Sequence, residues 1–570
     1  MPHFHASFLH PRFQLDACTA AASLDDVLSE REARVAQRET LRNQLRHSLS
    51  EREAEAAQRE ALRKPLCRED SLSSTVSGLS NFARSANYSL LSFSLNLAGP
   101  HKRGPLADFF FAAALTLLVD ELSRRFGKLK EPLIRAGRAG AWALLAIPAD
   151  AQSCKAFCLE LEDGLPAGLL WDLDVYVPET GQKLSRSTLG WAERPCLICG
   201  RKVSFCARSR AHSWQELERE SRRLMKEALL SEAADALWLA AEKSLFYEAL
   251  ATPKAGLVDR LDPGAHTDMD IYSFVDSSLA LGPSLRKFIE AGMVKSFANR
   301  EKTSASSGDK TNSPKREKIS DEFREKAIPV ISASSGFTEK NHSDQIVTFK
   351  TLAVLGQQAE RSMFRASGGV NTQQGLIFSL GFLLFAAGQK LRERVEALDR
   401  AFEQRESEEL HQDVTQALFP TATELATGAS ALATAFLDWR GDSEESRKRG
   451  ARAAVLSGYR ESLSALTILR RERAEGGDED ESSLAALLYL MSRIEDSNIL
   501  RRAALRQHAG AQNELCQMQK RAAEILNLPR KERSEACCLW NQELCRKGLS
   551  PGGAADQLAL TRFFDFLEVE

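Results

Sequence analysis

Residues 108–126 read "DFFFAAALTLLVDELSRRF", and the apolar side chains that dominate this stretch predict a buried helix. Before it, "LLSFSLNLAGP" at 90–100 predicts a short strand that leads into a turn. After it, "GLLWDLDVYVP" at 168–178 predicts another strand. Because a helix lies between strands, we expect the N-terminal half of the chain to adopt an α+β fold.

The pattern of the chain changes after Trp214. From there to the C-terminus, the sequence is rich in Ala, Leu, Glu and Arg and has few strand-like runs, which predicts an all-α domain. We expect the domain boundary near residues 218–226. One segment, 299–343, is crowded with Ser, Lys, Glu and Asn and has few large apolar residues, so we expect it to be an inserted flexible loop.

A helical unit occurs twice near the N-terminus, at 28–42 and at 49–63, with a spacing of 21 residues. Both copies are rich in Arg, Glu, Gln and Ala and lack Gly and Pro, which predicts helices. A duplicated helix exposed to solvent is the simplest interpretation. A Ser-rich connector at 71–89 follows the second copy.

The overall composition argues against some classes of partner. The 570 residues carry a net charge of −2, so the chain has no general attraction to nucleic acid or to an anionic membrane. The apolar runs 109–119 and 377–388 are shorter than the ~20 residues that cross a bilayer, and residues 1–13 lack the pattern of a secretory signal. The eleven cysteines are unevenly spread, unlike a disulfide framework. We expect a reduced, cytoplasmic protein with no nucleic-acid or membrane partner.

Two aspartates lie two positions apart on the second predicted strand. Asp172 and Asp174 therefore project from the same face of that strand. Such a pair suits Mg²⁺, which takes oxygen ligands and usually shares them with phosphates. Solvated acids at a strand edge are the alternative.

Many cations and four residues of metal-ligand type follow these aspartates. The cations can clamp a polyphosphate or an acidic carrier protein. These cationic residues are Lys183, Arg186, Arg194, Arg201, Lys202, Arg208 and Arg210. Cys196, Cys199, Cys206 and His212 form the pattern C-x2-C-x6-C-x5-H, which can make a closed tetrahedral Zn²⁺ site. The spacing differs from that of a standard zinc finger, and reduced cysteines that pack a small knuckle are the alternative.

A Gly/Pro-punctuated stretch in the second half, "ALATPKAGLVDRLDPGAHTDMD" at 249–270, combines acids with bases. Oxygen ligands beside cations suit a metal-bound nucleotide. We predict that Lys254 and Arg260 bind this substrate, that His266 acts in catalysis, and that Asp268 and Asp270 bind Mg²⁺. A polar cap between helices is the alternative.

Two later stretches extend this prediction. In "LMSRIEDSNILRR", Asp496 and Asn498 lie near arginines at helical spacing, where an ion-paired helix face is the alternative. In "GLSPGGAADQLALTRFF", Gly552 and Gly553 begin a helix whose free N–H groups can receive phosphate, although an ordinary helix start is also common.

Four motifs of the first half occur in the order of a known family: "LDDVLSEREARVAQRE", "LLSFSLNLAGPHKRGPL", "WDLDVYVPETGQKLSRSTLG" and "RPCLICGRKVSFCARSRAHSWQEL". Over about residues 24–217 the chain thus resembles CitX, the holo-citrate lyase synthases. The resemblance implies transfer of a phosphoribosyl-dephospho-CoA group to a serine of the acyl carrier protein (gamma subunit) of citrate lyase, with release of pyrophosphate. The family's Asn-x-Pro-Gly-Pro turn has Ala98 in place of its first proline.

In that reaction, a metal ion and cations neutralise the departing pyrophosphate. We therefore expect Asp172 and Asp174 to bind Mg²⁺. We expect Lys102 and Arg186 to contact phosphate, and Asn96 to orient the substrate at the turn after the first strand.

The polar stretches of the second half, together with "SGGVNTQQGLIFSLG" at 367–381, resemble CitG, the triphosphoribosyl-dephospho-CoA synthases, over about residues 228–567. That resemblance implies an all-helical domain that uses ATP and 3'-dephospho-CoA. A ribose hydroxyl displaces adenine, and the triphosphate stays attached. Such chemistry requires stabilisation of a cation-like ribose, protonation of adenine and a Mg²⁺-triphosphate clamp.

The second half departs from the family pattern at several positions. Gln373 and Gln374 stand where the family has His and Lys, Ala454 replaces a glutamate, and Ala554 replaces a serine. Gln can hydrogen-bond a nucleotide but cannot transfer protons or neutralise phosphate, so these changes suggest impaired chemistry. The other family positions persist, and we expect catalytic roles for Asn371 and Asp496 and binding roles for Thr372, Arg452 and Asn498. Asp556 also persists.

The whole chain therefore resembles a CitX–CitG fusion. We predict an extension at 1–23, a CitX-like α+β domain at 24–217, for which a nucleotidyltransferase-like arrangement is one option, and a CitG-like all-α domain at 225–570. We expect both enzymatic activities and Mg²⁺, with Zn²⁺ as a further option. Two alternatives stay open: a second half that only binds and delivers the precursor, and malonate decarboxylase as the client.

Overall fold

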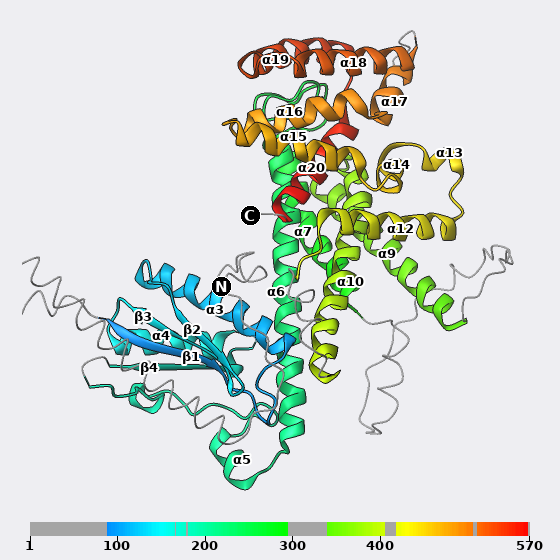
Figure 1. The fold of residues 1–570 in the computed structure, drawn as a ribbon. Helices are drawn as coiled ribbons and strands as arrows, with labels where there is room; N and C mark the ends of the chain where they lie inside the picture. Colours follow the sequence, from blue (N-terminus) through cyan, green and yellow to red (C-terminus); the bar gives the residue numbers. More distant parts are fainter. Residues whose placement is uncertain are drawn as a thin grey trace, which may run out of the picture. The chain divides into compact units, whose positions relative to one another are not determined.

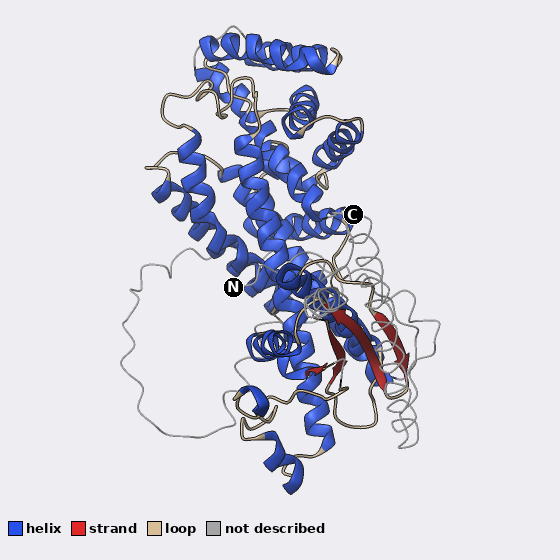
Figure 2. Ribbon diagram, turned by 90° about the vertical axis from the view of Figure 1, so that its left-hand side faces the viewer, coloured by secondary structure: helices blue, strands red, loops and turns tan. Residues whose placement is uncertain are grey.

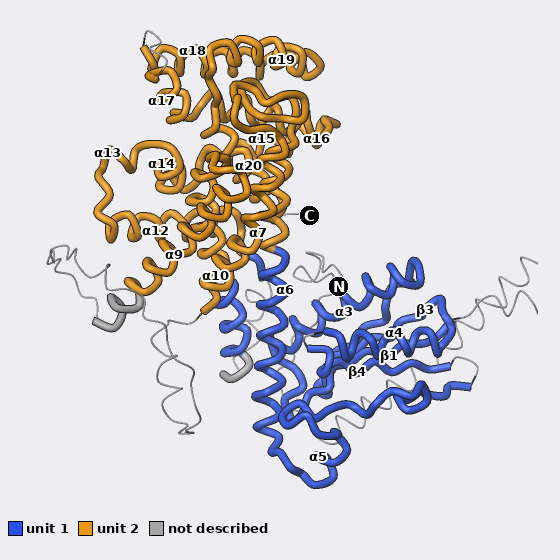
Figure 3. Tube along the Cα trace, turned by 180° about the vertical axis from the view of Figure 1, so that it is seen from behind, with its two compact units in different colours: residues 1–236, 391–419 blue, residues 237–390, 420–570 orange. Residues whose placement is uncertain are grey.

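The computed structural model describes residues 88–165, 167–177, 180–294, 339–404, 418–505 and 510–567. The chain divides into two units (Figure 3), one comprising Met1–Ala236 with Leu391–Phe419 and the other Leu237–Lys390 with Pro420–Glu570. The predicted extension, both helical copies, nearly all of the Ser-rich connector and most of the predicted insertion lie outside the described residues.

The first unit contains a four-stranded antiparallel sheet with the strand order β2-β3-β1-β4 (Figures 1 and 2). Its strands are β1 (Ser89–Leu95), β2 (Leu133–Gly137), β3 (Gly140–Ile147) and β4 (Trp171–Tyr176). Two helices pack against the sheet, α3 (Pro105–Phe126) and α4 (Ala151–Gly164). The predicted α+β fold is confirmed, and α3, β1 and β4 occupy the three stretches from which it was predicted.

Local sequence explains where the two helices begin and end. Pro105 occupies the first turn of α3, where a missing N–H group costs nothing, and Gly127 ends the helix with φ of 92°, which favours glycine. Asp150 caps α4 by accepting a hydrogen bond of 2.8 Å from the Ser153 amide. The aromatic ring of Phe93 in β1 stacks on Phe111 of α3, with centroids 5.0 Å apart, and joins sheet to helix.

The polar segment after β4 contains the short helix α5 (Val203–Ser209) and leads into the long helix α6 (Trp214–Leu250). The predicted boundary at 218–226 falls inside α6, which continues unbroken through it. In this part of α6, Arg222 and Lys226 both form ion pairs with Asp399 of α10 (Gln374–Gln404). Both α6 and α10 contribute residues to each unit.

The second unit is all-helical in its described residues, as predicted (Figure 2). Besides α6 and α10, its helices are α7 (Ile271–Met293), α9 (Glu339–Ala366), α12 (Ala422–Arg440), α13 (Glu444–Arg447), α14 (Gly450–Leu456), α15 (Arg460–Ala474), α16 (Glu479–Arg493), α17 (Ser497–Leu505), α18 (Ala511–Leu526), α19 (Arg530–Lys547) and α20 (Gly552–Leu567). Because α9 begins at Glu339, the last residues of the predicted insertion are helical, and its boundary there needs correction.

Two apolar features organise this unit. Buried side chains of α15, α16, α18, α19 and α20 form one core cluster, in which Trp540 and Met491 are among the largest members. Among the described helices, α10 alone is long and apolar enough to cross a membrane, but 72% of its most apolar window is buried inside the structure. Such burial is typical of a core helix in a globular fold.

Candidate active sites

The two aspartates of β4 lie on one face of the sheet. In the register of β1 and β4, Asp172 is opposite Ser94 and Asp174 is opposite Ser92. The intervening Leu173 is fully buried on the other face. The alternation of the strand thus brings both carboxylates together, as expected from their spacing.

Side chains from α4 hold β4 at the residue between these aspartates. The Leu173 carbonyl accepts a hydrogen bond of 2.6 Å from Lys155 Nζ, and its amide donates one of 3.0 Å to Glu162 Oε1. Strand β4 is at the edge of the sheet, where backbone groups would otherwise lack partners. Burial raises the pKa of Glu162, and Arg194 and Arg186 offset this by pairing with it. The positions of the two catalytic candidates therefore depend on a buried charge network.

The charges around the aspartates fit a cation with oxygen ligands. Burial and the neighbouring charge of Asp174 raise the pKa of Asp172. Lys183 Nζ lies 2.5 Å from an oxygen of Asp174, and Arg194 is 4.0 Å from Asp172. Since two close carboxylates repel each other, a shared divalent ion would stabilise both in the ionised form. The residues present therefore fit Mg²⁺.

The other predicted phosphate contacts of this unit have partners within the protein. The guanidinium of Arg186 binds Glu162, both oxygens of Asp163 and a backbone carbonyl, so each of its nitrogens is used. The Lys102 amine donates to the carbonyl of Leu97. Asn96 is exposed directly after β1, and its backbone N–H donates a hydrogen bond to the carbonyl of Leu170.

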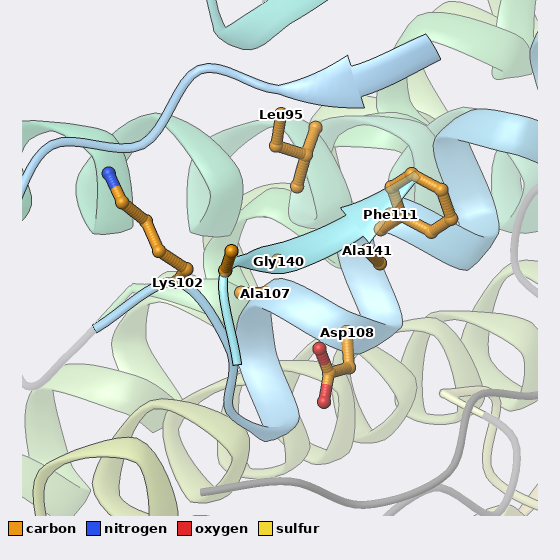
Figure 4. Close-up of a pocket in the computed structure, with 8 residues that line it drawn as sticks. Leu95, Lys102, Ala107, Asp108, Phe111, Gly140 and Ala141 are labelled. Carbon is orange, nitrogen blue, oxygen red and sulfur yellow. The ribbon is translucent and has the colours of Figure 1, made fainter. Parts of the chain in front are cut away.

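Figure 4 shows a small cavity beside Lys102, whose side chain points away from the carboxylate of Asp108. The volume of this cavity is about 10 Å³. This is room for one water molecule and far too little for a nucleotide. This cavity therefore does not serve as a nucleotide site.

The four metal-ligand residues of the first unit come together. We call residues 193–213 the knuckle. In it, the ligand atoms of Cys196, Cys199, Cys206 and His212 all lie within 4.8 Å of one another. A hydrogen bond from the Arg201 side chain, followed by bonds from its amide and from His212, lowers the pKa of the Cys199 thiol to about 5. The sequence pattern predicted this proximity.

A cavity of about 290 Å³ is the candidate site of the second unit. It is lined by the end of α6 and the loop after it, by the loop before α10 and by the starts of α14, α17 and α20. The lining includes eight residues from the predicted set: Lys254, His266, Asp268, Asn371, Thr372, Asn498, Gly552 and Gly553. Residues hundreds of positions apart in sequence thus share one cavity.

The loop before α10 is held by its own amide side chains. Gln373 is 2% exposed, and its Oε1 accepts a hydrogen bond of 2.9 Å from Ser277 of α7. Asn371 and Gln374 bond reciprocally, since Asn371 Oδ1 accepts from the Gln374 amide and Asn371 Nδ2 donates to Gln374 Oε1. The two glutamines that replace His and Lys therefore have structural partners in this chain.

Two carboxyl groups in the cavity have contrasting surroundings. Glu248 of α6 is almost fully buried and forms an ion pair of 2.7 Å with Lys254. Burial, and then the charges of Glu248 and Asp496, raise the pKa of Asp556 well above its usual value. A Cβ on Gly375 would lie 2.3 Å from an oxygen of Asp556, so a larger residue at 375 would force this carboxyl to move. One acid is thus held as an ion pair and the other favours its protonated form.

Asp496 lies beneath the cavity and not in its lining. Its side chain is 1% exposed and accepts hydrogen bonds from the amides of Asn498 and Ile499 in α17 and of Ala554 in α20. Burial raises the pKa of Asp496 to about 6, against the lowering effect of these amides. The amide groups at the start of α20 were predicted to receive phosphate. One of them, the amide of Ala554, already donates to the carboxylate of Asp496.

The surroundings of His266 favour its neutral ring. Burial, and then the charge of Arg502, lower its pKa to about 4. Arg502 Nη2 lies 3.1 Å from His266 Nδ1, and Nε2 lies 2.8 Å from the hydroxyl of Ser550. Because an arginine only donates, Nδ1 accepts and Nε2 carries the proton that bonds Ser550.

Other predicted residues lie outside the lining of this cavity. Arg260 forms an exposed ion pair with Asp480, and Arg452 pairs with Asp442 at 2.9 Å. Asp270 caps α7 in a reciprocal capping box with Ser273. Asp268 and Asp270 therefore do not converge on one site, and this pair does not fit a shared Mg²⁺.

The structure adds residues that sequence reasoning did not assign to the site. Glu248 gave no signal, because a glutamate near the end of a helix is common. Arg501 and Arg502 are arginines of the stretch "LMSRIEDSNILRR", for which an ion-paired helix face was the alternative, and both line the cavity. Asp556 stood out only as a family position that persists.

Comparison with known proteins assigns both halves of the chain to families. Residues 234–570, more than half of the chain, match the family described as CitG: ATP:dephospho-CoA triphosphoribosyl transferase. The chain belongs to the CitG family. Residues 74–228 match a second family, CitX: apo-citrate lyase phosphoribosyl-dephospho-CoA transferase. CitX and CitG domains thus occur in one chain, as the sequence motifs indicated.

One relative matches most of the chain, and another matches little more than half of it. The chain is 27% identical over 484 residues to "Protein CitXG" of Haemophilus influenzae. The matched region covers 83% of this chain and 90% of that relative. It is 32% identical over 336 residues to a probable 2-(5''-triphosphoribosyl)-3'-dephosphocoenzyme-A synthase of Streptococcus mutans, with 58% of this chain and 95% of the relative covered. The prediction of a transferase that acts in synthesis of the citrate lyase prosthetic group is confirmed.

Proposed function

We propose that this chain performs two successive reactions. The second unit, which we call the CitG unit, makes triphosphoribosyl-dephospho-CoA from ATP and 3'-dephospho-CoA with release of adenine. The first unit, which we call the CitX unit, then transfers the phosphoribosyl-dephospho-CoA group to a serine of the citrate lyase acyl carrier protein. The observation that carries this proposal is that each matched region contains its own polar site, the β4 aspartates at 74–228 and the cavity at 234–570. We expect the protein in the cytosol, where these nucleotides are available.

In the CitG cavity, Asp556 is our choice for the group that protonates adenine. The departing base needs a proton as its bond to ribose breaks, and a partly buried carboxyl in the cavity lining with a raised pKa can donate one. The negative charge of Glu248, ion-paired with Lys254, can stabilise the cation-like ribose. This arrangement supports catalysis despite Gln373 and Gln374.

The remaining cavity residues suit substrate binding. Arg501 and Arg502 line the cavity and can bind the triphosphate. Asn371, Thr372 and Asn498 offer hydrogen bonds to ribose or base. Asp496 positions Asn498 and the start of α20, and we assign it no direct contact with substrate. Asp268 can hold a cation that accompanies the triphosphate, because it is exposed at the cavity edge.

In the CitX unit, Asp172 and Asp174 would hold Mg²⁺, which supplies charge neutralisation for the departing pyrophosphate. Lys183 approaches Asp174 directly and can contribute a further positive charge. We assign Arg186 and Arg194 to supporting the Glu162 network that fixes β4.

The test separates the two reactions in one set of proteins. Asp556→Asn should lower adenine release from ATP and 3'-dephospho-CoA by ~10²–10⁴-fold, the range for loss of a general acid. The same variant, given ready-made precursor, should load the carrier at the parental rate. Asp174→Asn should release adenine at the parental rate but load the carrier much more slowly. Loading is measured as the mass of the intact carrier.

Each outcome decides between stated alternatives. An Asp556→Asn variant that releases adenine as fast as the parent would remove that residue from catalysis. A parent that binds 3'-dephospho-CoA but releases no adenine would establish the CitG unit as a binding and delivery module. Faster loading of a malonate decarboxylase carrier than of the citrate lyase carrier would change the client.

A further inference from the structure

The knuckle has almost no hydrophobic core of its own. In this fully described segment, only Cys196 and Cys206 are buried. Three of its large apolar side chains are exposed, with Ile198, Val203 and Phe205 at 39%, 38% and 53%. A segment with so little buried apolar surface cannot offset the entropy of ordering its backbone. Another interaction must hold it in place.

The backbone nevertheless makes a defined turn around the sulfur atoms. The Gly200 amide donates to the carbonyl of Cys196 at 3.0 Å, and Pro195 and Lys202 form an antiparallel bridge. Gly200 has φ of 69°, which favours glycine and lets the chain reverse directly after Cys199. Helix α5 then brings Cys206 back to the turn, and its end leads to His212.

The spacing of the ligand atoms is that of a coordination shell. The sulfurs of Cys199 and Cys206 are 3.4 Å apart, and His212 Nε2 is 3.3 Å from the sulfur of Cys199. A disulfide would require about 2.05 Å. Metal–ligand bonds of about 2.3 Å to sulfur and about 2.0 Å to nitrogen place the corners of a tetrahedron ~3.5–3.8 Å apart. These two distances are close to that value, and all four ligand atoms lie within 4.8 Å of one another.

We propose that the knuckle binds one structural Zn²⁺ through its three cysteines and its histidine. Three thiolates and a neutral imidazole form a closed shell with no open position, which is typical of structural and not catalytic zinc. Such a centre carries a net negative charge. Arg201 Nε donates to the sulfur of Cys199 at 3.3 Å and would stabilise that charge.

The consequence concerns the surface beside the CitX site. The metal would fix Phe205 and its neighbouring arginine in place, since the Arg201 guanidinium lies 4.9 Å above the Phe205 ring. Without the metal, residues 193–213 should lose their order, while the sheet and the CitG unit, which have their own cores, keep theirs.

The experiment begins with the full-length protein purified without chelators. Mass spectrometry of metals should find about one zinc per chain, and Cys199→Ser or Cys206→Ser should lose it. Cys516→Ser is the matched control, because that cysteine is exposed in α18 and is not one of the four clustered ligands, and this variant should keep its zinc. His212→Cys, which preserves four ligands, should also keep zinc, whereas His212→Ala should bind it more weakly.

Two further measurements separate metal binding from simple packing. Cobalt introduced in place of zinc should show the absorption bands of tetrahedral thiolate coordination. A zinc-selective chelator, used in the presence of excess Mg²⁺, should expose residues 193–213 to proteolysis and leave adenine release at the parental level. A metal-free parent that takes up no added zinc, protection that survives chelation, or a disulfide between Cys199 and Cys206 would each overturn the proposal.

Discussion

Replacing His266 with glutamine should change how the stability of the CitG unit depends on pH. The folded-state pKa is about 4, against 6.5 for an unperturbed histidine. Below pH 6.5 the unfolded chain takes up a proton that the folded chain refuses, so stability falls as pH falls toward 4. The difference of about 2.5 pH units corresponds at full extent to ~3.4 kcal/mol.

Most of that effect is accessible under mild conditions. Between about pH 7.5 and about pH 5, the histidine should lower the free energy of unfolding by ~2 kcal/mol in the parent and not in His266→Gln. Asp496, with a raised pKa of about 6, acts in the opposite direction, but equally in both proteins. The difference between parent and variant therefore isolates the histidine.

The assay is pulse proteolysis in urea, with mass spectrometry of peptides from the CitG unit. It reports on that unit even if the two units unfold separately. Ser550→Ala is the control, since it removes the hydrogen-bond partner of the ring but keeps the titrating group. Identical pH dependence in parent and His266→Gln would refute the reasoning, because it would mean that His266 takes up its proton at the same pH in the folded and the unfolded chain.

Three further predictions test the packing around the two sites. Glu162→Gln should destabilise the sheet unit by about 3 kcal/mol, because it breaks a buried ion-pair network, and should slow carrier loading; an unchanged urea midpoint for that unit would contradict this. Gly375→Ala should reduce adenine release by roughly 10²-fold, because the new Cβ would displace Asp556, with carrier loading at the parental rate as its control. Gln373→His combined with Gln374→Lys should give no faster adenine release than the parent, since Gln373 is fixed by hydrogen bonds to α7; a clear gain in rate would restore the interpretation of these positions as a weakened active site.

Local sequence patterns were sufficient for several parts of this protein. Alternation along 171–176 placed Asp172 and Asp174 on one face, and the structure agrees because side-chain direction in a strand depends only on local geometry. The cysteine and histidine spacing predicted a cluster that lies within one continuous segment. Family motifs identified both halves, since motif order is itself a property of the sequence.

Only the tertiary structure decided which polar residues share the CitG cavity. Glu248 and Asp556 are far apart in sequence, and only the packing of α6 against α20 brings them into one lining. Arg260 and Asp270 lie outside this lining for different reasons: Arg260 pairs with Asp480 of α16, a contact remote in sequence, whereas Asp270 caps α7 through its near neighbour Ser273. The hairpin of β2 and β3 was also missed, since a strand gains its stability from partners that local periodicity does not reveal.

The sequence by itself determined what depends on near neighbours along the chain: helix and strand type, the direction of the β4 carboxylates, the ligand spacing of the knuckle and the order of the family motifs. The tertiary structure decided what depends on burial and on distant charges. Asp556 and His266 show the difference, because burial raises the pKa of the acid and lowers that of the base. Both shifts arise from removing a charge from water, and how much water a side chain loses is fixed only when helices remote in sequence pack around it.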